Sequence, residues 1–403
     1  MSANLALAGA SLFTSLALAK TMGAQGFGEL AYALALGGYL LTLAAGGFDQ
    51  TLLRDLVQRP RLRSRLVSSS LLWRMILLAV GALGLLGVEA FTGLVRPLDV
   101  EDWGLILAFA LSALTLAPLF DAWGEFRLHT LLYVVERAVY FAVIWGILLL
   151  TPSILSVGAV AVALGLAGVV GLVLQAKTAL SRFRPTLERS DLWLGWILIK
   201  RNGWIWGSAL AQLSFGTLSK IVLGNGAGDT ALGGYAIAWQ VVTVGSLVTA
   251  QASRIGNPRL VALVRDGAPI ERERFLRNYL LAMIGVAGLV AVPALLAPTP
   301  LLGLLGPEYM AAAPAMRILS LYVVLIGVGQ VGLQYLIAAR IEWAYGVTLL
   351  LTALLSMILL SVLVPAHGAV GAAWAVLGSH GLGVVIYLLI MVGHLLKART
   401  ARA

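Results

Sequence analysis

Cysteine is absent from this chain of 403 residues, and charged side chains make up only 11% of it. The lack of cysteine excludes disulfides and thiolate metal sites. The scarcity of charge excludes an ordinary soluble domain, in which roughly a quarter of the residues are charged. The sequence also lacks the HExxH, GxSxG and phosphate-loop patterns of common enzymes. We therefore expect no enzymatic activity, no resident metal and no cofactor.

Hydrophobic residues, in contrast, make up 60% of the chain, and the mean hydropathy is +0.94. Apolar runs recur along the whole sequence at about 20 residues, the length that an α-helix needs to cross a bilayer. They predict an all-α, polytopic membrane protein of about twelve transmembrane helices. The expected spans are residues 3–19, 29–47, 70–93, 103–121, 130–150, 153–175, 203–223, 234–253, 279–298, 314–338, 343–364 and 369–395.

The net charge of +10 comes from Lys and Arg residues in short segments between the apolar runs. A nucleic-acid-binding protein would concentrate such residues on one helix or tail, so we expect no nucleic-acid partner. Cytoplasmic segments of membrane proteins are enriched in Lys and Arg, so the pattern places both termini in the cytoplasm, with the spans in the bacterial inner membrane. The clusters are Arg54, Arg59, Arg61, Arg63 and Arg65; Lys177, Arg182, Arg184, Arg189, Lys200 and Arg201; Arg254, Arg259, Arg265, Arg272, Arg274 and Arg277; and Lys397, Arg399 and Arg402.

The two halves of the chain resemble one another. The segment PSILSVGAVAVALGLAG from Pro152 matches PAHGAVGAAWAVLGSHG from Pro365, and Tyr32-Ala33 matches Tyr235-Ala236 at a similar offset. An internal repeat around a midplane cavity is common in transporters. The repeat predicts an N-terminal six-helix lobe (1–175), a cytoplasmic linker (176–202) and a C-terminal six-helix lobe (203–403).

Ionisable residues within spans are candidate functional groups, since each costs about 2.5 to 3.5 kcal/mol to insert. Three cations can attract an anionic headgroup such as a pyrophosphate, whose oxygens suit the planar fork of arginine. Two glutamines can line a sugar-binding surface. The substrate-binding candidates are therefore Lys220, Arg137, Arg74, Gln212 and Gln240.

Each of these candidates also has a structural interpretation. Arg74 and Arg137 lie close enough to the inner surface for their stems to snorkel, and Lys220 can snorkel outwards. Gln212 and Gln240 can instead bind helices together through hydrogen bonds.

A second group comprises candidates for coupling transport to an ion or proton: Glu136, Asp121 and His380. His380 can titrate near neutral pH and relay protons, although a single histidine on a helix also serves in packing. Glu136 and Arg137 are about 100° apart on a helix and need not pair. Arg74 is a plausible partner for Glu136.

Several short motifs carry a family resemblance over essentially the whole chain. They are MGAQGFG at 22–28, GFDQ at 47–50 before Leu53-Arg54, LGGYA at 232–236, LLGPEY at 304–309 and the segment 365–373. In order and in position relative to the spans, they resemble the polysaccharide and O-antigen flippases of the multidrug/oligosaccharidyl-lipid/polysaccharide exporter superfamily.

This resemblance implies two six-helix lobes that alternate between inward-open and outward-open states. The substrate would be an undecaprenyl-pyrophosphate-linked oligosaccharide, carried for surface polysaccharide biosynthesis, with the lipid tail left in the bilayer. The expected partners are the bilayer, this polyprenyl-linked glycan and other polysaccharide-assembly proteins. Relatives often have an acidic residue where this chain has Ser219-Lys220, a departure that argues against carboxylate-based coupling at this position.

Three other functions stay open. A drug/cation antiporter of the same superfamily usually needs buried carboxylates, whereas the deepest candidate here is a lysine. A membrane enzyme of polysaccharide assembly, such as a polymerase or ligase, would carry a large external loop, and the longest one expected here spans only residues 94–102. A scaffold protein would leave the internal repeat unexplained.

Overall fold

The computed structural model describes residues 2–180, 188–265 and 269–400. Over these residues it is helical and contains no strand, so the all-α prediction is confirmed. Three cations of the predicted cytoplasmic clusters, Arg182, Arg184 and Arg402, lie outside the described residues. The side chains of Lys397 and Arg399 lie outside them as well.

The chain divides into two compact units, Met1–Leu213 and Ser214–Ala403, with the boundary inside one long helix. The described parts of the predicted linker belong to the helices on either side of it. The lobe limits 1–175 and 203–403 thus stay a prediction. The first unit holds α1 (Ser2–Ala45), α2 (Phe48–Gln58), η1 (Pro60–Leu62), α3 (Arg63–Thr92), α4 (Val100–Ala110), η2 (Leu111–Leu114), α5 (Ala117–Ala122), α6 (Phe126–Leu150), η3 (Pro152–Ile154), α7 (Val157–Leu180) and the start of α8 (Arg189–Arg265).

The second unit contains the remainder of α8 and the helices that follow it. These are α9 (Pro269–Leu296), α10 (Pro298–Gly303), η4 (Pro307–Ala312), α11 (Ala313–Ala338) and α12 (Glu342–Thr400). Within this unit α11 packs against both α9 and α12.

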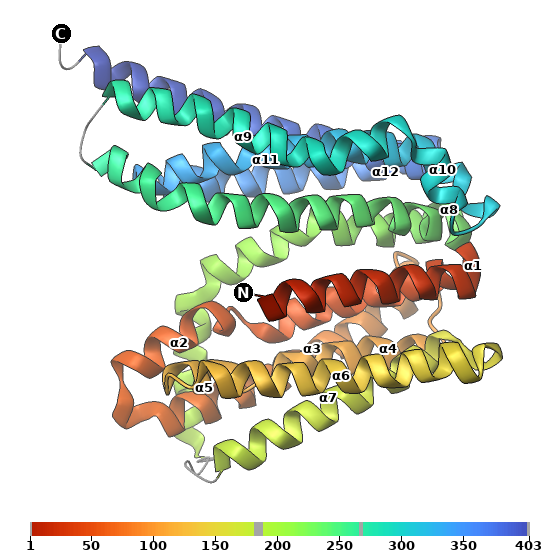
Figure 1. Ribbon diagram of the computed structural model, residues 1–403. Coiled ribbons are helices and arrows are strands. Elements are labelled where there is room, and N and C mark those ends of the chain that lie inside the picture. The colour runs from red at the N-terminus through yellow and green to blue at the C-terminus, as the bar shows by residue number, and fades with distance from the viewer. Residues whose placement is uncertain (1, 181–187, 266–268, 401–403) are drawn as a thin grey trace. The chain divides into compact units, whose positions relative to one another are not determined.

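Nine helical segments among the described residues are long and apolar enough to cross a membrane. Multi-pass membrane insertion therefore agrees with the prediction. Three of these segments, in α1, α8 and α12, each contain a pair of predicted spans. In Figure 1 the red ribbon of α1 reverses direction part-way along its length.

Glycine accounts for these interruptions. Gly23 (φ 70°, ψ 177°), Gly228 (φ 82°, ψ 172°) and Gly368 (φ 53°, ψ −130°) have backbone conformations that are not helical. The first two lie in a region of φ/ψ space that is essentially restricted to glycine. If the two halves of these three helices are counted separately, the nine segments become twelve spans. The number twelve stays a prediction.

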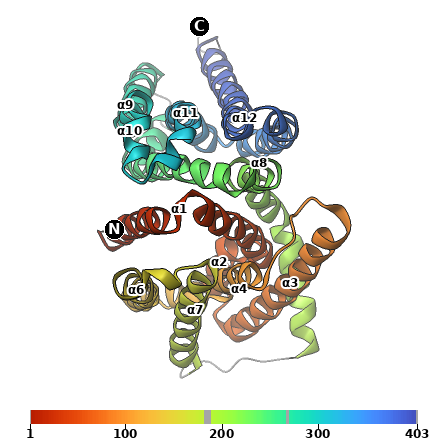
Figure 2. The same cartoon turned by 90° about the vertical axis from the view of Figure 1, so that its right-hand side faces the viewer.

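Unit 1 places α4 at the centre of its helices. This helix packs against α1 on one side and α7 on the other, while α6 lies beside α7 and α3 beside α1 (Figures 1 and 2). A hydrophobic cluster closes the end where α2 and α5 meet, and it includes Phe48, Leu66, Phe120 and Leu198. This packing positions the interruption between α4 and α5 inside the unit.

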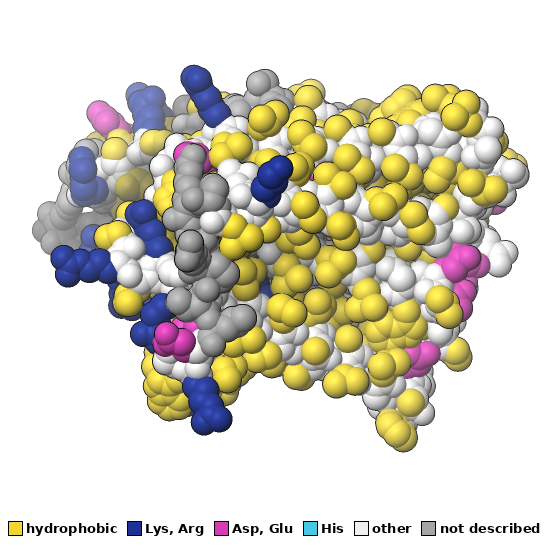
Figure 3. Space-filling model, turned by 90° about the horizontal axis from the view of Figure 1, so that it is seen from below, with side chains coloured by type: hydrophobic (Ala, Val, Ile, Leu, Met, Phe, Trp, Pro, Cys, Tyr) yellow, Lys and Arg dark blue, Asp and Glu magenta, His cyan; other side chains and the backbone are white. Residues whose placement is uncertain are grey.

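The surface has the distribution of a membrane protein. On the face in Figure 3, hydrophobic side chains cover most of the area, while Lys and Arg gather at one end. Bulky apolar side chains such as Phe13, Leu83, Leu149 and Leu354 are more than half exposed. Water would strongly disfavour so much exposed apolar surface, whereas lipid tails accept it.

Candidate functional site

The helix that crosses unit 1 as α4 and α5 is interrupted between Ala110 and Ala117. A short 3₁₀ turn follows α4, and Thr115 then has an extended backbone (φ −58°, ψ 142°). Backbone polar groups within a membrane must be satisfied by protein, because no water is available in the hydrocarbon. Side chains from neighbouring helices meet this need. Gln175 on α7 accepts hydrogen bonds from the Leu116 N–H (2.7 Å) and the Thr115 hydroxyl (3.2 Å).

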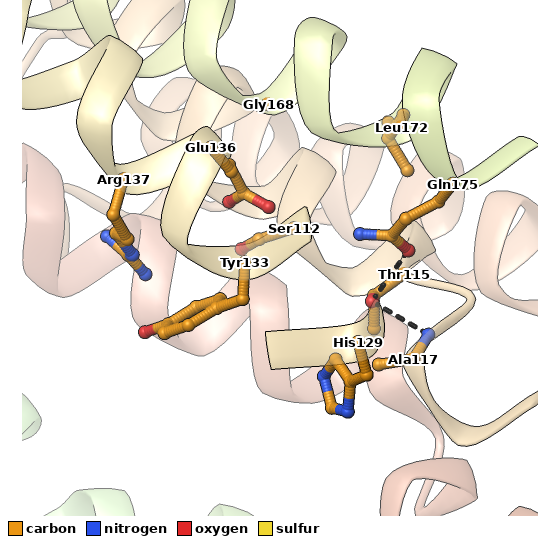
Figure 4. Close-up of a pocket in the computed structure, with 10 residues that line it drawn as sticks. All are labelled: Ser112, Thr115, Ala117, His129, Tyr133, Glu136, Arg137, Gly168, Leu172 and Gln175. Atoms are coloured by element: carbon orange, nitrogen blue, oxygen red, sulfur yellow. Dashed lines mark hydrogen bonds between the residues drawn. The ribbon is translucent and has the colours of Figure 1, made fainter. Parts of the chain in front are cut away.

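A cavity of about 240 Å³ opens beside this interruption; we call it the Glu136 cavity. Its walls come from α6, α7 and the segment between α4 and α5 (Figure 4). The lining residues are Ser112, Thr115, Ala117, His129, Tyr133, Glu136, Arg137, Gly168, Leu172 and Gln175.

Glu136 lies against the backbone of α7. A Cβ atom added to Gly171 would be only 2.6 Å from the Glu136 Oε2 atom, so the absence of a side chain at Gly171 allows this close approach. No ion pair or hydrogen bond of the Glu136 carboxylate is found among the described residues. The carboxylate is therefore available to a proton or a cation.

Arg137 points away from Glu136 in Figure 4, as their helical separation predicts. Its guanidinium lies over the ring of Tyr133, 5.2 Å from the centroid. Its Nε is buried and has no hydrogen-bond partner within the described ranges. Arg137 thus lies over an aromatic face and forms no ion pair within the described ranges, although its charge also acts on the neighbouring Glu136.

Asp121 is connected to the Glu136 cavity by its contact with His129. It lies near the end of α5 and pairs with the Nδ1 of His129 at 2.7 Å, and His129 lines the Glu136 cavity. Sequence reasoning singled out Asp121 and Glu136 but missed His129, Tyr133 and Gln175. A signal was present: residues 129, 133 and 136, like 168, 172 and 175, have the spacing of a single helix face.

Arg74 corrects two expectations. Its side chain is 1% exposed and forms an ion pair with Asp49 at 2.7 Å, so it neither snorkels nor pairs with Glu136. Its Nη1 donates to the carbonyl of Ala113, within the interruption between α4 and α5. The guanidinium therefore satisfies a backbone group that the interruption leaves without a helical partner.

The partner of Arg74 faces a second cavity of about 360 Å³, the Asp49 cavity. The Asp49 carboxylate is half exposed, so solvent or a ligand can reach the acidic side of the ion pair. Ser112 lines this cavity and the Glu136 cavity alike. The remaining lining residues are Leu41, Thr42, Ala45, Gly47, Ile205, Trp206 and Ala209.

Unit 2 places Lys220 and His380 in one aromatic cluster. The Lys220 Nζ lies 6.0 Å from the centroid of Trp239. Tyr322 connects the two ends, since it lies 5.9 Å from Trp239 and 5.1 Å from His380, centroid to centroid. Phe215 packs edge-on against His380. No carboxylate of the described chain is within ion-pair distance of Lys220.

The two glutamine candidates lie outside these groups. Gln212 is exposed at the end of unit 1, and Gln240 is partly buried next to Trp239. Neither lines the Glu136 or the Asp49 cavity.

A family model described as a polysaccharide biosynthesis protein matches residues 1–254. The chain belongs to this family. The expected resemblance is thereby confirmed, although comparison with curated proteins gives no match.

Solved structures share the fold of this family member. An inward-facing multidrug resistance MATE transporter of the MOP superfamily aligns with a TM-score of 0.75 and 15% identity, over 98% of this chain and 96% of the other. The lipid II flippase MurJ in an inward closed conformation aligns with a TM-score of 0.74 and 12% identity, over 98% and 88%. A MOP superfamily transporter from Pyrococcus furiosus has a TM-score of 0.57 and 13% identity, over 99% and 93%.

The family match places the chain among polysaccharide biosynthesis proteins, and the solved structures show its fold. This role in polysaccharide biosynthesis is the one expected from the sequence. The Glu136 and Asp49 cavities and the Lys220 cluster are places where the described chain holds ionisable groups among its helices.

Proposed function

We propose that this protein is a flippase that moves an undecaprenyl-pyrophosphate-linked oligosaccharide across the bacterial inner membrane by alternating access. Lys220 carries the proposal: it is an intramembrane cation with no carboxylate partner among the described residues. A cation is costly in hydrocarbon, and an anionic ligand offsets that cost. The pyrophosphate of a lipid-linked glycan, as in O-antigen assembly, is such a ligand.

Three other cations at helix contacts differ from Lys220 because each forms an ion pair. Arg74, Arg65 and Arg201 each have an aspartate, namely Asp49, Asp191 and Asp55 respectively. These pairs are neutral overall and serve in packing. Lys220 in unit 2 and Arg137 in unit 1 lie over aromatic rings and form no ion pair among the described residues, so their charge can act on a ligand. We assign each of these two cations to attraction of the pyrophosphate. Arg74 is assigned a supporting role, because it connects α2 with the segment between α4 and α5.

The sugar and the coupling group are further parts of the proposal. Gln212 and Gln240 are assigned to the polar surface that the glycan contacts. Glu136, together with Asp121 through His129, is assigned to coupling, because its carboxylate lines a cavity and forms no ion pair with another described residue. His380 adds a second titratable group, within the Lys220 cluster.

A drug/cation antiporter is the second candidate, and the unpaired Glu136 carboxylate favours it. The two functions differ in the charge of the group that they must bind. An anionic substrate requires Lys220, whereas a cationic drug would be repelled by it. The same variant therefore separates them.

Complementation of a flippase-deficient strain tests the proposal. We expect Lys220→Ala to abolish surface glycan export while the protein still inserts at normal levels, and Lys220→Arg to restore part of it. Arg61→Ala, at an exposed cation in η1, serves as the matched control and should export normally. Full export by Lys220→Ala would refute the assignment. Drug resistance conferred by the wild type, and raised in Lys220→Ala, would favour the antiporter.

A further inference from the structure

The start of α8, residues 189–201, has an inverted distribution of side chains. Its inner face consists of Asp191, Gly195, Leu198 and Ile199, all buried against unit 1 at helical spacing. A helix on the surface of a soluble protein would be polar on its other face. Here the outer face carries Leu192, Trp193, Trp196 and Ile197, with Trp193 67% exposed.

Ion pairs and a hydrogen bond hold this segment on unit 1. Asp191 is fully buried and pairs with Arg65 at 3.3 Å, while Arg201 pairs with the buried Asp55. Trp73 on α3 donates its indole N–H to the carbonyl of Leu192 at 2.8 Å. The orientation of the helix about its own axis is thereby set, and the apolar face points outwards.

The same contacts build a groove between the segment and α3. Trp73 stacks on Trp196 with 5.6 Å between ring centroids, and Gly195 lets the Trp73 ring approach the helix closely. The groove is shallow and open, with a volume of about 560 Å³, and is lined by Trp73, Arg189, Leu192, Trp193 and Trp196. Lys200 adds a second cation, with its Nζ 5.1 Å from the centroid of Trp196.

Several cations lie on or beside the start of α8: Arg189 lines the groove, Lys200 lies over Trp196, and Arg65 and Arg201 form the ion pairs. Figures 1 and 2 show the start of α8, in light green, crossing α3 near the end where α2 and α3 meet. Tryptophan together with Lys or Arg is the combination that membrane proteins place at the headgroup level.

We propose that this groove binds an anionic phospholipid of the surrounding leaflet. Arg189 and Lys200 hold the phosphate and headgroup charge, while an acyl chain lies along Leu192, Trp193 and Trp196. The carboxylates of Asp191 and Asp55 are neutralised by Arg65 and Arg201, while that of Glu188 accepts a hydrogen bond from the Ser190 hydroxyl. Among the described residues neither Arg189 nor Lys200 forms an ion pair, so both cations can bind the lipid. An amphipathic helix with apolar rings and flanking cations binds anionic bilayers by these two forces together. The site is separate from the cavities assigned to transport.

The absence of natural cysteine makes a direct test practical. Ile197→Cys places one label on the exposed face without removing a residue that lines the groove. The full chain, labelled with an environment-sensitive fluorophore, is placed in nanodiscs of phosphatidylethanolamine that contain brominated phosphatidylglycerol or brominated phosphatidylcholine at equal mole fraction. Thermal unfolding of the labelled protein, matched to the wild type, verifies its fold.

We expect brominated phosphatidylglycerol to quench the label at least about twofold more strongly, because Arg189 and Lys200 enrich the anionic lipid at the groove. Combining Arg189→Gln and Lys200→Gln with the labelled variant should remove this preference. Arg61→Gln, an exposed cation outside the groove, should leave it intact.

Two results would overturn the proposal. Equal quenching by both lipids would mean that the face only touches the bilayer and selects no headgroup. An absence of quenching by either lipid would mean that another part of the chain or a second copy covers the face.

Discussion

Arg74 and Asp49 form an ion pair of 2.7 Å in which the arginine side chain is 1% exposed and the carboxylate 53% exposed. The same guanidinium donates to the carbonyl of Ala113. One buried cation thus connects the start of α2 with the interruption between α4 and α5. Because the Asp49 carboxylate faces a cavity, the pair combines a structural contact with a polar surface inside unit 1.

Arg74→Ala should destabilise the protein by about 1 to 3 kcal/mol, because the carbonyl of the buried Ala113 loses its hydrogen bond. The substitution also removes the cation of Asp49, whose carboxylate is half exposed and therefore contributes less. We expect a lower midpoint of thermal unfolding in detergent. The midpoint of Arg74→Lys should lie between those of the wild type and Arg74→Ala, since an ammonium keeps the charge but lacks the planar fork of a guanidinium. Arg61→Ala, at an exposed position, should unfold like the wild type, and an equal midpoint for Arg74→Ala would contradict the assigned role.

Gln175→Leu should cost about 1 to 3 kcal/mol, because the Leu116 N–H then loses its acceptor inside the membrane. Thermal unfolding of this variant and the wild type measures the difference. Gln212→Leu, at an exposed glutamine, provides the matched comparison for stability. An equal shift of the unfolding midpoint by Gln175→Leu and Gln212→Leu would mean that the hydrogen bond from Leu116 to Gln175 does not contribute to stability.

Two glycines of α8 should respond to alanine with opposite signs. An added Cβ meets open space at both Gly228 and Gly207, so only the backbone differs. Gly228 has φ 82° and ψ 172°, and alanine there should destabilise by about 1 to 3 kcal/mol. Gly207 is helical, and alanine there should stabilise by about 0.5 to 1 kcal/mol. The midpoint of thermal unfolding should fall for Gly228→Ala and rise for Gly207→Ala. Shifts of the same sign would show that backbone strain does not determine the effect of alanine at Gly228.

Glu136→Gln should lower glycan export at least about a hundredfold, which is the low end of the usual contribution of one positioned proton-transfer group. The amide keeps the shape against Gly171, so the amount of folded protein should stay normal. Export measured by complementation, together with the inserted amount, tests this. Glu342→Gln changes an exposed carboxylate at the start of α12 and should export normally. Wild-type export by Glu136→Gln would remove this residue from the coupling assignment.

Parts of the site could be predicted from the sequence. Glu136 and Arg137 stand out as charges within an apolar run, and their divergence follows from helix geometry alone. The cavity face of α6 can be traced through residues 129, 133 and 136 at helical spacing. The pairing of Arg74 with Asp49 could not be predicted, because several carboxylates lie at similar distances along the chain and only packing selects among them.

The amino-acid sequence alone determined the membrane class, the all-α fold, the approximate spans and the family. Each of these depends on local apolarity or on short motifs, which act over a single helix and need no partner. Tertiary structure decided which charges are neutralised, with Arg74 paired and Lys220 not. It also brought Lys220 and His380 into one aromatic cluster and turned part of the predicted linker into a helix with an exposed tryptophan face. Such contacts join residues far apart in the chain, and only the packing of whole helices determines which of them meet.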